Sequence, residues 1–78
     1  ANMSGSGYSD DLAGYGAFIS QRLYVELLDE SIYYIPAWAV FYLEGLHEDA
    51  LDSYGEEDWS GASRHWAHGV LILEWLTR

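Results

Sequence analysis

The chain contains no cysteine, no lysine, a single proline and no long uninterrupted apolar run. Without cysteine it can form neither disulfides nor thiolate metal sites. No apolar run reaches the roughly twenty residues that a helix needs to cross a bilayer. The N-terminal stretch also lacks the basic flank and apolar core of a signal peptide. We therefore expect a cytoplasmic protein with no membrane partner.

Positive charge is nearly absent as well. Three arginines stand against thirteen Asp and Glu residues, which gives a formal net charge of −10. Such a surface repels nucleic-acid phosphates and anionic lipids, so direct binding to either is not expected. It favours a basic protein partner. It also suits a small domain of a halophile, in which the carboxylates serve solvation alone, and the sequence leaves both explanations open.

Apolar and aromatic residues are abundant for so short a chain. Half of the 78 residues are hydrophobic, and 17% are aromatic, with four Trp and seven Tyr. This composition is too apolar for a disordered chain, yet a single domain of this length buries only a small core. The surplus rings predict an interface, because Trp and Tyr are the residues that anchor protein contacts.

Apolar residues at spacings of three and four predict an all-α domain with three helices, over about 11–29, 36–53 and 60–77. The first stripe consists of Leu12, Tyr15, Ile19, Leu23 and Leu27. The second consists of Ala39, Leu43, Leu46 and Ala50, which Trp38, Phe41 and Tyr42 enlarge. The third consists of Ala62, Trp66, Gly69, Val70, Leu73 and Leu76. The expected result is a small three-helix bundle.

The boundaries of this domain follow from composition. Residues 1–9 are rich in Gly and Ser and predict a flexible arm before a single helical domain over 10–78. Small residues at 13, 14, 16 and 17 suit a place where another helix or a Trp ring comes close. Asp58 or Ser60 can cap the last helix. An alternative α+β fold, with a short hairpin within 22–35, stays open because Ile32-Tyr33-Tyr34-Ile35 is β-prone.

The last helix is so apolar that it predicts a homodimer. The run Val70 to Leu73 is followed directly by Trp75 and Leu76, which leaves little of the far face polar. The residues that we expect at an apolar and aromatic interface are Trp59, Trp66, Trp75, Leu71 and Ile72.

Acidic residues concentrate in the middle of the chain and predict a negative ridge. Its members are Glu44, Glu48, Asp49, Asp52, Glu56, Glu57 and Asp58. Those between 44 and 52 share a helix face, where like charges repel one another. The hypothesis that follows is a non-enzymatic binding module that presents the ridge to a basic partner surface. Its sharpest form is an inhibitor that mimics nucleic-acid charge, of the anti-defence type.

No cofactor is expected, but histidines allow a metal-binding alternative. His65 and His68 lie three residues apart on the last helix, and imidazole suits zinc, nickel or iron. Glu44 and His47 form a Glu-x-x-His pair, the spacing used in helical di-metal bundles. The alternative is therefore a metal-binding helical dimer that uses these four residues.

The end of the chain adds a resemblance to this alternative. The residues that carry it are His68, Leu73, Glu74, Trp75, Leu76 and Arg78. They are similar to the end of the metal-binding helix of the encapsulated ferritins, which are short helical chains with a ferroxidase site built across a dimer. The chain departs from that family at His65 and Leu27, where the family has carboxylate ligands, and at Pro36, where its helix continues.

Catalytic motifs are not found. The serines lack a Gly-x-Ser-x-Gly setting, there is no cysteine nucleophile, and Gly5-x-Gly7 precedes no strand–helix unit. The sequence therefore predicts a protein that is not an enzyme.

Overall fold

The computed structural model describes the backbone of residues 5–78 and the side chains from residue 12 onward. It contains three helices: α1 (Gly5–Ser31), α2 (Ala37–Gly55) and α3 (Trp59–Leu76). The prediction of a small all-α, three-helix domain is confirmed. No residue in the range 5–78 forms a strand, so the alternative hairpin within 22–35 is wrong. That stretch is instead the last part of α1 and a five-residue connection.

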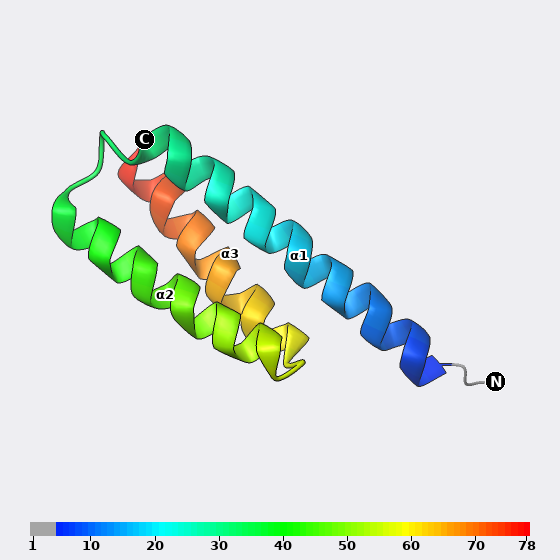
Figure 1. Cartoon of the computed structure of the whole chain (residues 1–78). Coiled ribbons are helices and arrows are strands. Elements are labelled where there is room, and N and C mark those ends of the chain that lie inside the picture. The colour runs from blue at the N-terminus through cyan, green and yellow to red at the C-terminus, as the bar shows by residue number, and fades with distance from the viewer. Residues whose placement is uncertain (1–4) are drawn as a thin grey trace.

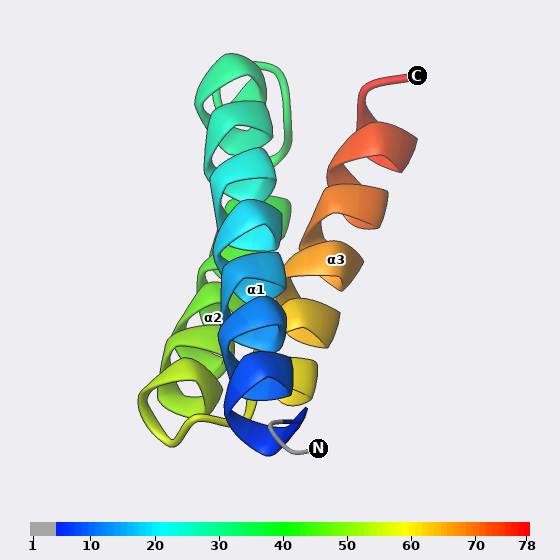
Figure 2. The same ribbon diagram turned by 90° about the vertical axis from the view of Figure 1, so that its right-hand side faces the viewer.

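Helix α3 holds the molecule together. It packs against both α1 and α2, whereas α1 and α2 touch each other little. Figures 1 and 2 show α3 alongside the other two helices, running antiparallel to α2. The chain measures 50 × 21 × 15 Å along its principal axes. Three helices in so thin a body leave much of α1 and α2 facing outward.

Helix α1 begins earlier than the sequence indicates. It starts at Gly5, so residues 5–9 continue the helix rather than forming an arm, and residues 1–4 lie outside the described part of the chain. Once the stretch around Ala17 to Leu28 is helical, each further residue adds a backbone hydrogen bond without a new nucleation cost. The glycines weaken this extension but do not stop it.

The two connections end the helices for identifiable reasons. Pro36, with φ −69° and ψ 155°, is the N-cap of α2, where its missing N–H removes no helical hydrogen bond. After α2, Glu57 adopts a left-handed conformation with φ 62° that turns the chain. The side chain of Asp58 then accepts a hydrogen bond from the backbone N–H of Gly61 at 3.1 Å. Asp58 is therefore the N-cap of α3, one of the two residues expected there.

The core lies where α3 meets the other helices. Its largest fully buried side chains are Trp66, Tyr24, Leu43 and Leu73. Small residues let these helices approach closely: Ala17, Ala39, Ala50 and Ala62 are each completely buried. The ring of Trp59 packs on Gly14, where a Cβ would lie 3.6 Å from the indole. The predicted core faces of α2 and α3 are confirmed, except for the three rings expected to enlarge that of α2.

The predicted core face of α1 is largely wrong. Leu12, Tyr15, Ile19 and Leu23 are between 46% and 64% exposed, whereas the buried side chains of this helix between residues 12 and 31 are Ala17, Tyr24 and Ser31. Helix α3 approaches α1 on the side that carries small residues, because only there can the two backbones come near each other. The large apolar side chains are left on the outer face.

None of the helices in the described residues is long and apolar enough to cross a membrane.

Candidate protein-binding surface

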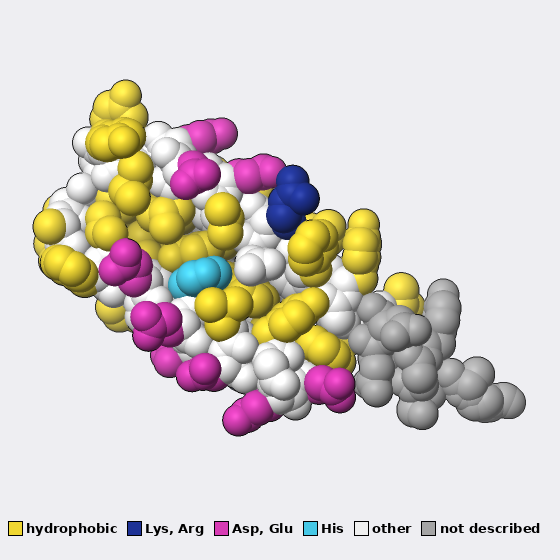
Figure 3. Space-filling model, viewed as in Figure 1, with side chains coloured by type: hydrophobic (Ala, Val, Ile, Leu, Met, Phe, Trp, Pro, Cys, Tyr) yellow, Lys and Arg dark blue, Asp and Glu magenta, His cyan; other side chains and the backbone are white. Residues whose placement is uncertain are grey.

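The outer face of α2 is acidic over its C-terminal half. Glu44, Glu48, Asp49 and Asp52 are all exposed on this helix, and Glu56 and Glu57 follow, also exposed, in the turn after it. Spacings of three and four residues bring the four helical carboxylates to the side of α2 that faces away from the core. The predicted acidic residues therefore lie on one side of the molecule, and acidic side chains follow α2 in Figure 3.

Asp58 differs from the other acidic residues, because its carboxylate caps α3 through Gly61. The structure gives it a local role at the helix N-terminus. The name "acidic face" is used below for Glu44, Glu48, Asp49 and Asp52.

The same side of α2 is aromatic over its N-terminal half. Trp38 is 60% exposed and Phe41 is 72% exposed, with Tyr42 half exposed beside them. Tyr33 and Tyr34, in the connection before α2, are among the most exposed side chains of the chain. Hydrophobic side chains gather at that end of the molecule in Figure 3. We call Trp38, Phe41 and Tyr42 the "aromatic face".

The aromatic face continues onto α3. The ring of Tyr42 meets that of His68 edge-on, with centroids 6.3 Å apart. Because α2 and α3 are antiparallel, residues that precede Tyr42 on α2 lie beside residues that follow His68 on α3. Trp38, one turn before Tyr42, is therefore beside the stretch of α3 that contains Leu71 and Trp75. Leu71 and Trp75 are both exposed, at 64% and 70%. The two helices thus present rings and a leucine on neighbouring stretches of surface.

The other residues predicted for the apolar interface are placed differently. Trp66 is only 1% exposed and belongs to the core, so its assignment to an interface is wrong. Trp59 is half-buried against the ring of Tyr54, with centroids 5.0 Å apart, and against Gly14. Ile72 is half-buried. Of the five predicted residues, only Leu71 and Trp75 are largely exposed.

Sequence reasoning assigned the rings of α2 to the core and so missed them as surface residues. A usable signal was present: along the second helix, Trp38, Phe41 and Tyr42 belong to the same series, with steps of three and four residues, as Gly45, Glu48, Asp49 and Asp52. Apolar residues that share a face with carboxylates point to solvent.

His47 serves as the hydrogen-bond acceptor for the buried indole N–H of Trp66. Its Nδ1 accepts a hydrogen bond of 2.9 Å from Nε1 of Trp66, and its ring stacks on that of Tyr24. The hydroxyl of Tyr24 donates to the backbone carbonyl of Leu43 at 2.8 Å. Burial, with a smaller effect of Glu44, raises the pKa of Tyr24 to about 12. These contacts place His47 in a structural network.

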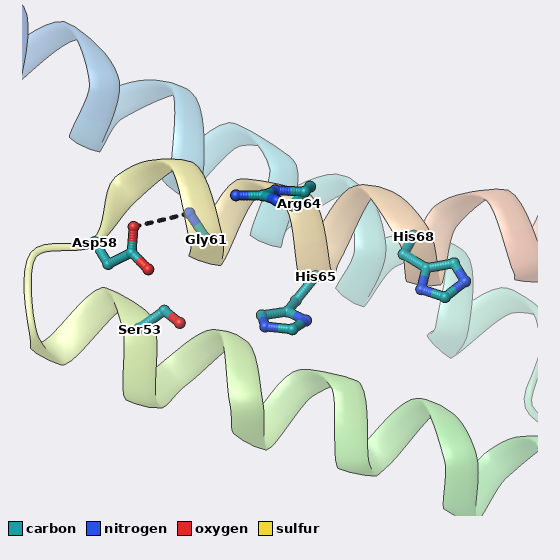
Figure 4. A pocket seen from close by; sticks show the side chains of 6 residues that line it. All are labelled: Ser53, Asp58, Gly61, Arg64, His65 and His68. Carbon is teal, nitrogen blue, oxygen red and sulfur yellow. Dashed lines mark hydrogen bonds between the residues drawn. The ribbon is translucent and has the colours of Figure 1, made fainter.

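The four residues of the metal hypothesis do not converge. His47 is held by Trp66, whereas Glu44 is exposed on α2. His65 and His68 line an open pocket of about 490 Å³ between α2 and α3. Figure 4 shows them there with Arg64, Asp58, Gly61 and Ser53. Within the described residues, no three His, Asp or Glu side chains are grouped so that they could hold a metal ion.

Comparison with models of known protein families, with curated proteins and with solved structures finds no match for this chain.

Proposed function

We propose that this protein is a non-enzymatic binding module that docks α2 against the basic surface of another protein. The acidic face supplies charge complementarity, and the aromatic face supplies the anchors. The proposal includes a cytoplasmic location. In its sharpest form the protein is an inhibitor that occupies a surface where the partner would otherwise hold nucleic-acid phosphates.

The observation that carries this proposal is the division of one helix face into two halves. Side chains of the N-terminal half are aromatic and exposed, and those of the C-terminal half are carboxylates. Neither half serves the core of this chain, because α2 uses Ala39, Leu43 and Ala50 for that purpose. Protein interfaces typically combine exposed Trp and Phe with a charged rim. The rings fill pockets of the partner, and the charges determine which partner binds.

The electrostatics favour a basic partner over nucleic acid itself. In the described structure the one salt bridge joins Arg22 to Glu26, on the exposed surface of α1. The carboxylates of α2 are therefore not neutralised by cations of the same chain. They repel phosphates and attract Lys and Arg, at a range of about 10 Å in moderate salt.

The experiment is capture from a lysate of the source cell with immobilised protein, followed by identification of the retained proteins. We expect a basic protein that is eluted by raised salt. Capture of this basic protein should be lost in the variant that combines Glu48→Gln, Asp49→Asn and Asp52→Asn. It should also be lost in Trp38→Ala, which removes an aromatic anchor.

A matched control removes the same number of charges elsewhere. Asp29→Asn, Glu30→Gln and Glu74→Gln are exposed substitutions outside the acidic face, and they should leave the capture unchanged. Equal loss with both triple variants would show that net charge alone retains the partner, and would contradict a docking role for α2. Unfolding of the free protein in dilute buffer, with refolding in molar potassium chloride, would support the halophile explanation instead.

A homodimer through α3 was expected from the sequence and stays a prediction. The exposed apolar residues of α3, Leu71 and Trp75, adjoin the aromatic face, so a dimer of this kind would compete with the basic partner.

A further inference from the structure

The outer face of α1 carries apolar side chains that nothing in the described structure covers. Leu12, Tyr15, Ile19 and Leu23 follow one another at spacings of three and four, which places them in one stripe along the helix. Each exposes about half of its surface. We name these four residues the "α1 stripe". A stripe of this spacing on a water-facing helix matches the seam between packed helices.

We propose that the α1 stripe is the contact with a second copy of this chain. The stripe is distinct from the surface proposed for the basic partner, and it differs from the α3 contact that the sequence predicts. Three observations select a second copy as its occupant.

The first observation is the amount of surface. The accessible surface of the chain is 5258 Å², against roughly 4,800 Å² for a compact monomer of the same mass, 8.8 kDa. The radius of gyration is 14.2 Å, against about 11.5 Å for a compact domain of this length. The chain as a whole thus exposes roughly 500 Å² more than a compact monomer does, and each partner of a standard interface contributes ~800 Å². A contact through α1 would bury part of this excess.

The second observation is the length of α1. It has 27 residues and α3 has 18, so α1 is longer by roughly 13 Å at 1.5 Å per residue. Trp59, the first residue of α3, packs on Gly14. Ala13 lies one turn before the fully buried Ala17, yet it is exposed. The N-terminal end of α1 thus extends past the other helices, as Figure 1 shows, and a second α1 is long enough to support it.

The third observation is charge. In a chain of net charge −10, residues 12–25 contain no Asp or Glu, and Arg22 is their one formal charge. Two copies that met through α2 would bring their acidic faces together, which is repulsive. The α1 stripe itself lies in a stretch without carboxylates, and Glu26 is the first acidic residue to follow it. Charge therefore disfavours self-association through α2, which leaves α2 for a basic protein.

The test is sedimentation equilibrium of the full chain from micromolar to millimolar concentration. The wild type should form a dimer over this range. Ile19→Glu should raise the dimer Kd by at least about tenfold, because it places a charge in the centre of the apolar contact. Ile19 is nearly half exposed, so the variant should keep the helical circular dichroism of the wild type. If it does not, Tyr15→Glu, at a more exposed position, replaces it.

Leu71→Glu is the matched control, because it places the same charge on the exposed side of α3. It should dimerise like the wild type. A wild type that stays monomeric at millimolar concentration overturns the proposal. So does a dimer that Leu71→Glu dissociates and Ile19→Glu leaves intact, since that result assigns the contact to α3.

Salt provides a second readout. Because the copies repel each other through their net charge, added salt should tighten an apolar dimer, whereas it should weaken binding to a basic partner. A dimer that dissociates as salt rises would be held by ion pairs, and that outcome also contradicts the α1 contact.

Discussion

Tyr24 and Gly69 show how closely α1 and α3 approach each other. A Cβ built on Gly69 would lie 2.7 Å from ring carbons Cδ1 and Cε1 of Tyr24. The ring cannot easily move aside, because its hydroxyl is bonded to the carbonyl of Leu43 and its face stacks on His47. The absence of one side chain on α3 therefore makes room for the largest buried ring of α1.

This contact predicts the effect of adding one methyl group. Gly69→Ala should lower the free energy of unfolding by about 1–3 kcal/mol through overpacking, despite the better helix propensity of Ala. Gly45→Ala is the control, since nothing lies within 4 Å of its added Cβ, and it should stabilise the protein by up to about 1 kcal/mol. Urea unfolding followed by circular dichroism measures both. Midpoints that move in the same direction would contradict the close approach.

The same tyrosine predicts a loss of stability in alkali. Its pKa is raised to about 12, while an exposed tyrosine has a pKa near 10, so the fold favours the neutral phenol. The corresponding stabilisation is fully present below pH 10 and is lost as the pH rises from 10 towards 12. At about 1.4 kcal/mol per unit the loss is about 3 kcal/mol.

Tyr24→Phe isolates this effect from that of the other six tyrosines. At neutral pH the variant should be less stable by about 1 kcal/mol, because one hydrogen bond is lost. Between pH 10 and 12 its stability should fall less steeply than that of the wild type, as measured by urea unfolding at each pH. Parallel curves would show that Tyr24 does not titrate in this way.

At the scale of the elements, hydrophobic periodicity predicts the three helices and the core faces of α2 and α3. In α2 and α3 the apolar residues spaced by three and four are the ones that are buried. Helix α1 is different. Its large apolar residues and its small residues occupy different sides, and a hydrophobic stripe identifies the side with the larger residues. Which side is buried depends on how near α3 can come. The expectation that another helix or a Trp ring comes close to residues 13, 14, 16 and 17 is confirmed at Gly14 and Ala17, whereas Ala13 is exposed and nothing lies within 4 Å of a Cβ on Gly16.

The candidate surface could be predicted in part. The carboxylates of α2 are exposed because ions are costly to bury, so their position follows from the sequence. Trp66 was assigned to the wrong environment, because an indole can anchor an interface or fill a core with equal ease. In the core its Nε1 donates to Nδ1 of His47, an acceptor on α2 that no spacing rule pairs with it.

The cap of α3 gives a prediction at this scale. Asp58→Ala should lower the free energy of unfolding by about 1 kcal/mol, because the backbone N–H of Gly61 loses its acceptor. Asp58→Asn removes the same charge but retains an acceptor, so it should cost much less. Thermal unfolding compares the two. Equal destabilisation would mean that charge at the helix terminus, rather than the hydrogen bond, stabilises α3.

At the scale of the whole molecule, the chain builds its core from one face of each helix and leaves two kinds of surface outside. One is the apolar stripe of α1, and the other is the aromatic and acidic side of α2. Both exceed what solubility requires of a small domain, since exposed rings and crowded like charges each carry a cost. We propose contacts with other chains as the physical reason to retain them.

The most direct measurement is the salt dependence of the Kd for the partner obtained by capture. The account predicts that Kd rises steeply with salt for the wild type. The variant with Glu48→Gln, Asp49→Asn and Asp52→Asn should bind more weakly, with a distinctly shallower dependence, while the control with Asp29→Asn, Glu30→Gln and Glu74→Gln should keep the wild-type slope. A wild-type slope in the α2 variant would contradict the assignment of this helix as the binding surface.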